Sequence, residues 1–111
     1  MPDAPHHFIP APKDPAALME GWQEFDKRRD GMLHAMTGGL WLHRHVWFGR
    51  PMAHLVSVDR DALLAWGARV GMPAERIQFH PLKDPRSGVV RDAWHWDLAG
   101  PFLPAKRSAT E

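Results

Sequence analysis

Three short segments of the sequence carry side chains that bind metal ions. His43 and His45 lie in the first segment, His54 in the second, and His95 with Asp97 in the third. Imidazole nitrogens and carboxylate oxygens are ligands that zinc, manganese and iron accept in proteins. If the fold brings the segments together, these five residues predict a site for Zn, Mn or Fe, where a bound water becomes a nucleophile near neutral pH.

A β-hairpin over residues 40–58 would present the first three histidines together. The residues on either side of Gly49-Arg50 favour strands, and that pair predicts a two-residue turn, since a type II′ turn takes glycine first. Folding the chain there places His45 opposite His54, and directly opposed residues share a face of the sheet. His43 shares that face because strand side chains alternate with a period of two.

Residues 89–98 predict a last strand, whose end also alternates. His95 and Asp97 lie on one face of it, and Trp96 lies on the other. If this strand joins the hairpin with matching parity, His95 and Asp97 meet the other histidines. We therefore expect His95 and Asp97 to act as acid–base groups in catalysis as well as metal ligands.

Arg50 lies next to this predicted site in the sequence. An arginine beside histidines can hold a phosphate or a carboxylate with two parallel hydrogen bonds, so we expect Arg50 to bind the substrate. The alternative is a solvated arginine in a surface turn. The histidines also have a structural interpretation, because Trp41 and Trp47 flank them and a core face would simply contain hydrogen-bonded imidazoles.

Two helices are expected to cover the sheet. Asp14 and Pro15 are typical of a helix start, and apolar residues then recur at three- and four-residue steps until Gly38-Gly39. Asp59 or Ser57 predicts the start of the second helix, and Gly71 predicts its end. The methionines and aromatic residues of the first helix also suggest a homodimer interface.

The fold class expected from these elements is α+β, with a small, mainly antiparallel sheet of about three strands covered by two helices. Residues 1–13 contain four prolines and predict an extended arm that is either loose or bound to a protein partner. Residues 14–104 form the single predicted domain, and residues 105–111 form a polar tail.

The composition argues against several classes of protein. The 111 residues include 14 Lys and Arg against 13 Asp and Glu, so no strong field favours nucleic acid. Cysteine is absent, which excludes disulfides and cysteine-based zinc sites. No apolar run approaches the ~20 residues that span a membrane, and the first residues lack the pattern of a signal peptide. We expect a cytoplasmic protein without a membrane partner.

Several short motifs follow one another along the chain: Phe48-Gly49-Arg50, Met52-Ala53-His54-Leu55-Val56, Leu63-Leu64-Ala65, Val70-Gly71-Met72 and His95-Trp96-Asp97-Leu98. Their order resembles that of a DUF4031-like family of small bacterial and phage proteins of unknown function. The resemblance includes the stretch Leu40-Trp41-Leu42-His43 and covers residues 40–98.

The resemblance implies functional roles at particular positions. His54 matches the family's histidine after Phe-Gly-Arg, and His95 with Asp97 matches its His-Tyr-Asp motif, with Trp96 replacing tyrosine. Gln78 matches a glutamine of the family, whereas His43 stands where the family has an aspartate. The family has no established activity, so the resemblance supports a site and leaves the reaction open.

Two functional hypotheses follow. The first is metal-dependent hydrolysis of an anionic, phosphate-bearing substrate at the His/Asp site. The second is a non-catalytic binding or accessory protein, with a protein or nucleic acid as its partner and the histidines bonded within the fold.

Overall fold

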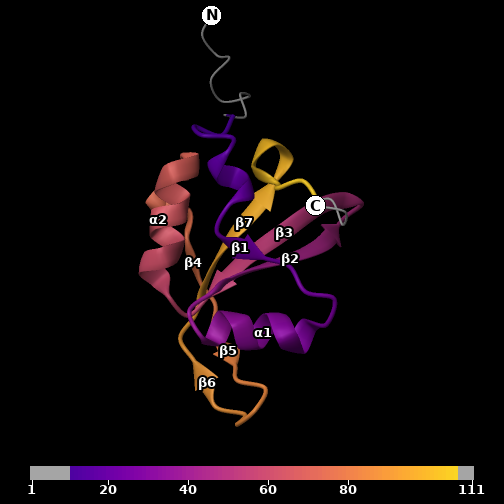
Figure 1. The fold of residues 1–111 in the computed structure, drawn as a ribbon, viewed down its shortest axis with the longest axis vertical. Coiled ribbons are helices and arrows are strands. Elements are labelled where there is room, and N and C mark those ends of the chain that lie inside the picture. Colours follow the sequence, from indigo (N-terminus) through magenta and orange to yellow (C-terminus); the bar gives the residue numbers. More distant parts are fainter. Residues whose placement is uncertain (1–10, 108–111) are drawn as a thin grey trace, which may run out of the picture.

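The computed structural model describes residues 11–107, which form an α+β fold with two α-helices (Figure 1). One sheet is mixed and has five strands in the order β1-β2-β3-β7-β4, and a second sheet pairs β5 with β6. The strands are β1 (Trp22–Gln23), β2 (Leu40–Trp47), β3 (Arg50–Ser57), β4 (Gln78–Phe79), β5 (Leu82–Lys83), β6 (Val90–Arg91) and β7 (Trp94–Ala99). The helices are α1 (Arg28–Met36) and α2 (Arg60–Val70), with 3-10 turns at Ala17–Met19, Ala74–Arg76 and Gly100–Phe102.

The predicted sheet of about three strands is therefore wrong. Its three long strands exist as β2, β3 and β7, which pair antiparallel, but β1 adds a parallel neighbour to β2 and β4 pairs with β7. A strand of two residues has no alternation to detect, so a pattern with a period of two cannot reveal it. The predicted last strand over residues 89–98 is also divided, because Val90–Arg91 pairs with β5 instead of joining the large sheet.

The expected first helix is shorter than predicted. Only Arg28–Met36 is α-helical, because Gly21 turns the chain at a φ of 84° and Trp22 then pairs in parallel with Leu40. The indole nitrogen of Trp22 donates a hydrogen bond to the carbonyl of Leu18. The two residues are four positions apart, as hydrogen-bonded residues of an α-helix are, but the donor here is a side chain. Trp22 is buried within the fold. Its side chain is therefore not exposed on a helix surface, where it could contact a second copy of the chain.

Helix α2 forms where the sequence predicts it and covers one face of the sheet. Asp59 caps its first turn by accepting a hydrogen bond from the backbone of Ala62, and Gly71 ends it in the left-handed conformation. Gly67 allows the helix to approach β7 closely, since a Cβ at this position would overlap the ring of Trp96. The indole of Trp96 donates to the carbonyl of Leu63 and fixes this contact at 2.8 Å.

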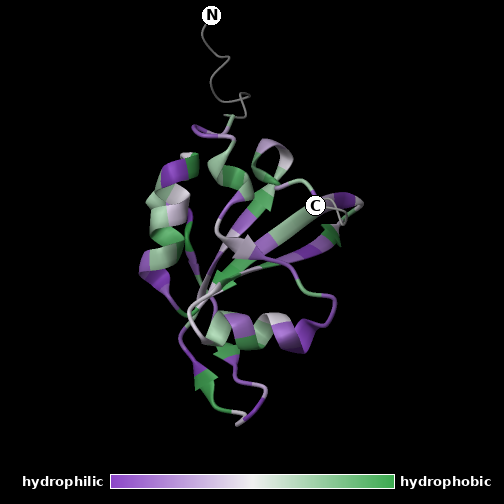
Figure 2. Ribbon diagram, viewed as in Figure 1, coloured by the Kyte–Doolittle hydropathy of each residue, from purple (hydrophilic) through white to green (hydrophobic). Residues whose placement is uncertain are grey.

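The opposite face of the sheet is only partly covered. Helix α1 and the β5–β6 pair lie at one end of the sheet (Figure 1), where Met36, Leu82 and Ala93 form a second core cluster with Trp41 and Val56. Both helices carry hydrophilic and hydrophobic residues side by side (Figure 2), as expected of helices with one buried face. Beyond Trp41 and Val56, this face carries the histidines.

The two ends of the described chain lie against the domain. Of the predicted 1–13 arm, residues 1–10 lie outside the described residues, and Lys13 donates a backbone hydrogen bond to Val70. Of the predicted 105–111 tail, residues 108–111 lie outside, and the guanidinium of Arg107 lies 3.8 Å from the ring centroid of Trp22. Among residues 11–107, no helix has the length and apolar character that crossing a membrane requires.

Candidate metal centre

The β2–β3 hairpin sets the first part of the site, through a turn one residue earlier than predicted. Its central residues are Phe48 and Gly49, with φ values of 48° and 76°, which is typical of a type I′ turn. His43 therefore lies opposite His54, and the predicted pairing of His45 with His54 is wrong. Moving the turn by one residue shifts the pairing by two, so every side chain keeps its predicted face.

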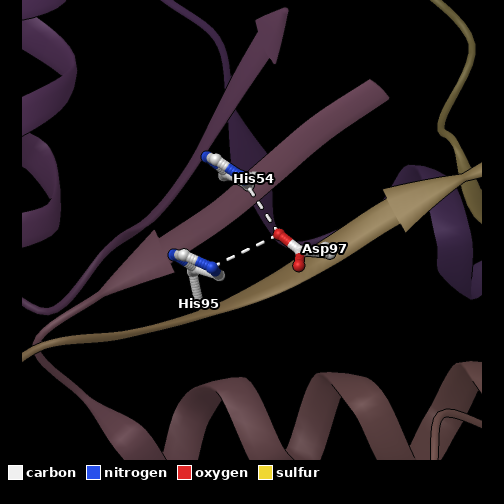
Figure 3. A group of neighbouring side chains, drawn as sticks. All are labelled: His54, His95 and Asp97. Carbon is white, nitrogen blue, oxygen red and sulfur yellow. Dashed lines mark ion pairs between the residues drawn. The ribbon is translucent and has the colours of Figure 1, made fainter. Parts of the chain in front are cut away.

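Strand β7 completes the site on the same face. His54 lies opposite Asp97 in the β3–β7 register, and His95 lies two residues before Asp97. The three side chains point toward one another (Figure 3). The Oδ1 atom of Asp97 lies 3.0 Å from Nε2 of His54 and 3.3 Å from Nε2 of His95. One ligand atom from each residue lies within 4.8 Å of the other two.

A fourth residue holds the carboxylate from the edge of the sheet. Gln78 is in β4, opposite His95, and its Nε2 donates a hydrogen bond of 2.6 Å to Oδ2 of Asp97. This contact occupies the carboxylate oxygen that does not approach the imidazoles. Oδ1 of Asp97 is thus oriented toward His54 and His95, as is usual for a carboxylate ligand held by an outer neighbour.

The imidazoles form a row across the sheet. The ring centroids are 4.4 Å apart between His45 and His54, 4.3 Å between His54 and His95, and 5.1 Å between His95 and His80. Two nitrogens in this row, Nδ1 of His45 and Nδ1 of His95, are buried and have no hydrogen-bond partner among the described residues. The described residues therefore leave one nitrogen unpaired in each of these two rings.

Burial and crowding keep the central histidines uncharged. Burial, followed by the neighbouring His95, lowers the pKa of His54 to about 4, although the Asp97 carboxylate acts in the opposite direction. Burial also lowers the pKa of His95, again against the effect of Asp97. Near neutral pH both rings thus carry a free nitrogen lone pair, which metal coordination requires.

The predicted ligands separate into two groups. His54, His95 and Asp97 lie together, whereas His43 packs against Trp41 with ring centroids 4.9 Å apart. Burial, the charge of Arg28 and His45 lower the pKa of His43. His45 contacts the ring of His54 but offers no ligand atom to the group.

The group of His54, His95 and Asp97 borders a cavity of about 360 Å³. Its lining residues are His45, Trp47, Met52, His54 and Asp97. Trp47 and Met52 were not among the predicted site residues, although their place on the histidine face follows from the alternation of the strands. The predicted anion-binding residue, Arg50, lines a neighbouring cavity instead.

No family model, curated protein or solved structure matches the chain. The resemblance to a DUF4031-like family therefore stays a prediction, and the inference of function depends on the site itself.

Proposed function

We propose that the chain binds one divalent transition metal, Zn, Mn or Fe, through His54, His95 and Asp97, and hydrolyses an anionic, phosphate-bearing substrate there. Two histidines and one carboxylate leave coordination positions open for water and substrate, as in catalytic zinc and non-haem iron sites. The observation that carries the proposal is the convergence of the three ligand atoms within 4.8 Å.

The distances within the group support a metal. Two ligands bound at about 2.0–2.1 Å in a tetrahedral arrangement lie about 3.4 Å apart. The contacts from Oδ1 of Asp97 to the two Nε2 atoms are 3.0 and 3.3 Å. Two of the three contacts in the group are therefore close to the spacing that a shared ion requires.

The surroundings support access by substrate. His95 is buried, while the side chains of His54 and Asp97 are 33% and 38% exposed at the cavity. A metal held by these residues would therefore be reached from one side only. A bound metal lowers the pKa of a coordinated water to about 7 and polarises a phosphoryl oxygen.

A residue of the protein would transfer the proton from the attacking water to the leaving group. In hydrolysis the hydroxyl of water joins phosphorus, the bond from phosphorus to the leaving oxygen breaks, and that oxygen takes up the remaining proton. His45 is adjacent to His54 and lines the cavity without belonging to the ligand group. Its imidazole is placed to relay that proton.

Metal binding is tested by elemental analysis of gently purified protein and by calorimetric titration of metal-free protein with Zn²⁺, Mn²⁺ and Fe²⁺. We expect one ion per chain, with affinity lost in His54→Ala and Asp97→Ala. The matched control is His34→Ala, because His34, on α1, contacts Phe25 and does not belong to the group. No binding of any of the three ions, or equal binding by all variants, would refute the proposal.

Hydrolysis is tested with bis(4-nitrophenyl) phosphate and the loaded protein. We expect release of 4-nitrophenolate that a chelator abolishes and that His54→Ala lacks. Metal binding without turnover of any phosphate ester would instead support the non-catalytic hypothesis.

A further inference from the structure

A second cavity adjoins the metal centre along the β2–β3 hairpin. It encloses about 520 Å³ beside the start of β3 and the end of β7. Its walls include Pro51, Met52, Ala99 and Pro101. Trp47 and Met52 line both this cavity and the one at the metal centre, so the two spaces share a wall.

Arg50 is the charged residue of the second cavity, and its side chain is exposed. Arg44, Arg69 and Arg86 each pair with a carboxylate. Arg50 forms no ion pair and no side-chain hydrogen bond with any residue between 11 and 107. A free guanidinium above apolar walls favours a carboxylate or phosphate attached to an apolar group.

The spacing along β3 sets the length of such a ligand. His54, Met52 and Arg50 follow one another on one face at two-residue steps. At about 3.3 Å per residue, the Cα atoms of His54 and Arg50 are about 13 Å apart. Met52 lies between them, and the indole of Trp47, opposite Arg50 in β2, borders both cavities. This indole is 59% exposed and offers a flat surface on which an aromatic group can stack.

We infer that the substrate is an elongated, amphiphilic anion. Its reacting group lies at the metal centre, its flat apolar part rests on Trp47 and Met52, and a terminal carboxylate or phosphate binds Arg50. This inference rests on the proposed function, because the metal centre defines one end of the ligand. It predicts poor binding of inorganic phosphate and of small esters that lack the apolar part.

The cavity itself is tested with metal-free protein and biphenyl-4-carboxylate, by calorimetry. We expect Arg50→Gln and Trp47→Ala each to weaken binding about tenfold, or about 1.4 kcal/mol. Biphenyl-4-carboxamide, which has no charge, is expected to bind weakly and equally to the wild type and Arg50→Gln. The control variant is Arg29→Gln, an exposed arginine of α1. Equal affinity of all variants for the carboxylate would overturn the inference.

The link to the metal centre is tested with zinc-loaded protein. 4′-Carboxybiphenyl-4-hydroxamate combines a metal-binding end with a distant carboxylate, whereas acetohydroxamate reports on the metal alone. We expect Arg50→Gln to remove most of the affinity gained over acetohydroxamate and to leave acetohydroxamate binding unchanged. An Arg50→Gln variant that binds both probes like the wild type would contradict the inference. If acetohydroxamate fails to bind, the proposed metal centre fails, and the metal-free titration still decides the role of Arg50 and Trp47.

Discussion

The imidazole rings of His54 and His95 stack face to face, with centroids 4.3 Å apart and planes inclined by 10°. Protonating both rings would place two positive charges in contact in a partly buried site. Burial, followed by the neighbouring His95, outweighs the opposing effect of Asp97 and lowers the pKa of His54 to about 4. Both rings are thus uncharged near neutral pH, at the cost of stability in acid.

Folding stability should therefore fall in mild acid. The pKa of His54 is 6.5 when unperturbed and about 4 in the fold, so the unfolded chain binds more protons between these values. The contribution of His54 is fully present above about pH 6.5 and is lost as the pH falls toward 4. Urea unfolding of metal-free protein at pH 7.5, 6 and 5 should show this loss, and His54→Gln should show a shallower one. The same slope in both proteins would assign the acid sensitivity to other groups.

Replacing Gln78 should weaken metal binding without unfolding the protein. Gln78→Leu removes the 2.6 Å hydrogen bond to Oδ2 of Asp97, and loss of such an outer partner typically costs about 10–100-fold in metal affinity. Because Gln78 is exposed on an edge strand, stability should change by less than about 0.5 kcal/mol. Competition with a chelator for Zn²⁺ measures the affinity. Gln23→Leu, on β1, is the control, and equal affinities would show that Gln78 does not position Asp97.

Much of the candidate site was predictable from the sequence because the error in the strand pairing was two residues. A shift of two residues leaves each side chain on the same face of the sheet. The turn lies at Phe48 and Gly49, one residue before the predicted position. Because of this error, the predicted partner of His54 is His45, whereas the observed partner is His43. Every histidine nevertheless lies on its predicted face of the sheet. The expected start at Asp59 or Ser57 and the expected end at Gly71 likewise made α2 predictable, and Asp59 is the residue that caps it.

Other features depend on contacts between distant segments and left no local pattern. Trp22 continues the apolar spacing of the predicted first helix, yet it pairs beside Leu40 because Gly21 adopts a positive φ. Contacts between distant segments also determine that His54 and His95, and not His43, lie beside Asp97. His43 packs beside Trp41 at the end that α1 covers, and the predicted extent of α1 was itself wrong.

Substituting Gly67 should destabilise the domain although it lies in a helix. Alanine at an exposed helical position usually gains about 1 kcal/mol over glycine. At Gly67 a Cβ would overlap the fully buried ring of Trp96, so Gly67→Ala should instead lose about 1–3 kcal/mol in urea unfolding. A double-mutant cycle with Trp96→Phe should show that the two losses are not additive. Additive losses, or a gain from Gly67→Ala alone, would contradict this close packing.

Replacing Phe48 should stabilise the hairpin. Phe48 adopts a φ of 48° and is 88% exposed, and a left-handed backbone costs an ordinary L-residue about 1–2 kcal/mol. Its edge contact with Trp47, at 4.9 Å between centroids, offsets only about 0.5 kcal/mol at an exposed site. Asparagine tolerates this conformation and is favoured before glycine in a type I′ turn, so Phe48→Asn should gain about 0.5–1 kcal/mol in urea unfolding.

Phe48→Ala distinguishes the cost of the left-handed backbone from the effect of the aromatic ring at this position. Alanine loses the contact with Trp47 and keeps the cost of the left-handed conformation, so its stability should equal or fall below that of the wild type. A gain in both variants would mean that the exposed ring, and not the backbone, is unfavourable. A loss in both would show that the pair of Trp47 and Phe48 holds the hairpin tip that borders the two cavities.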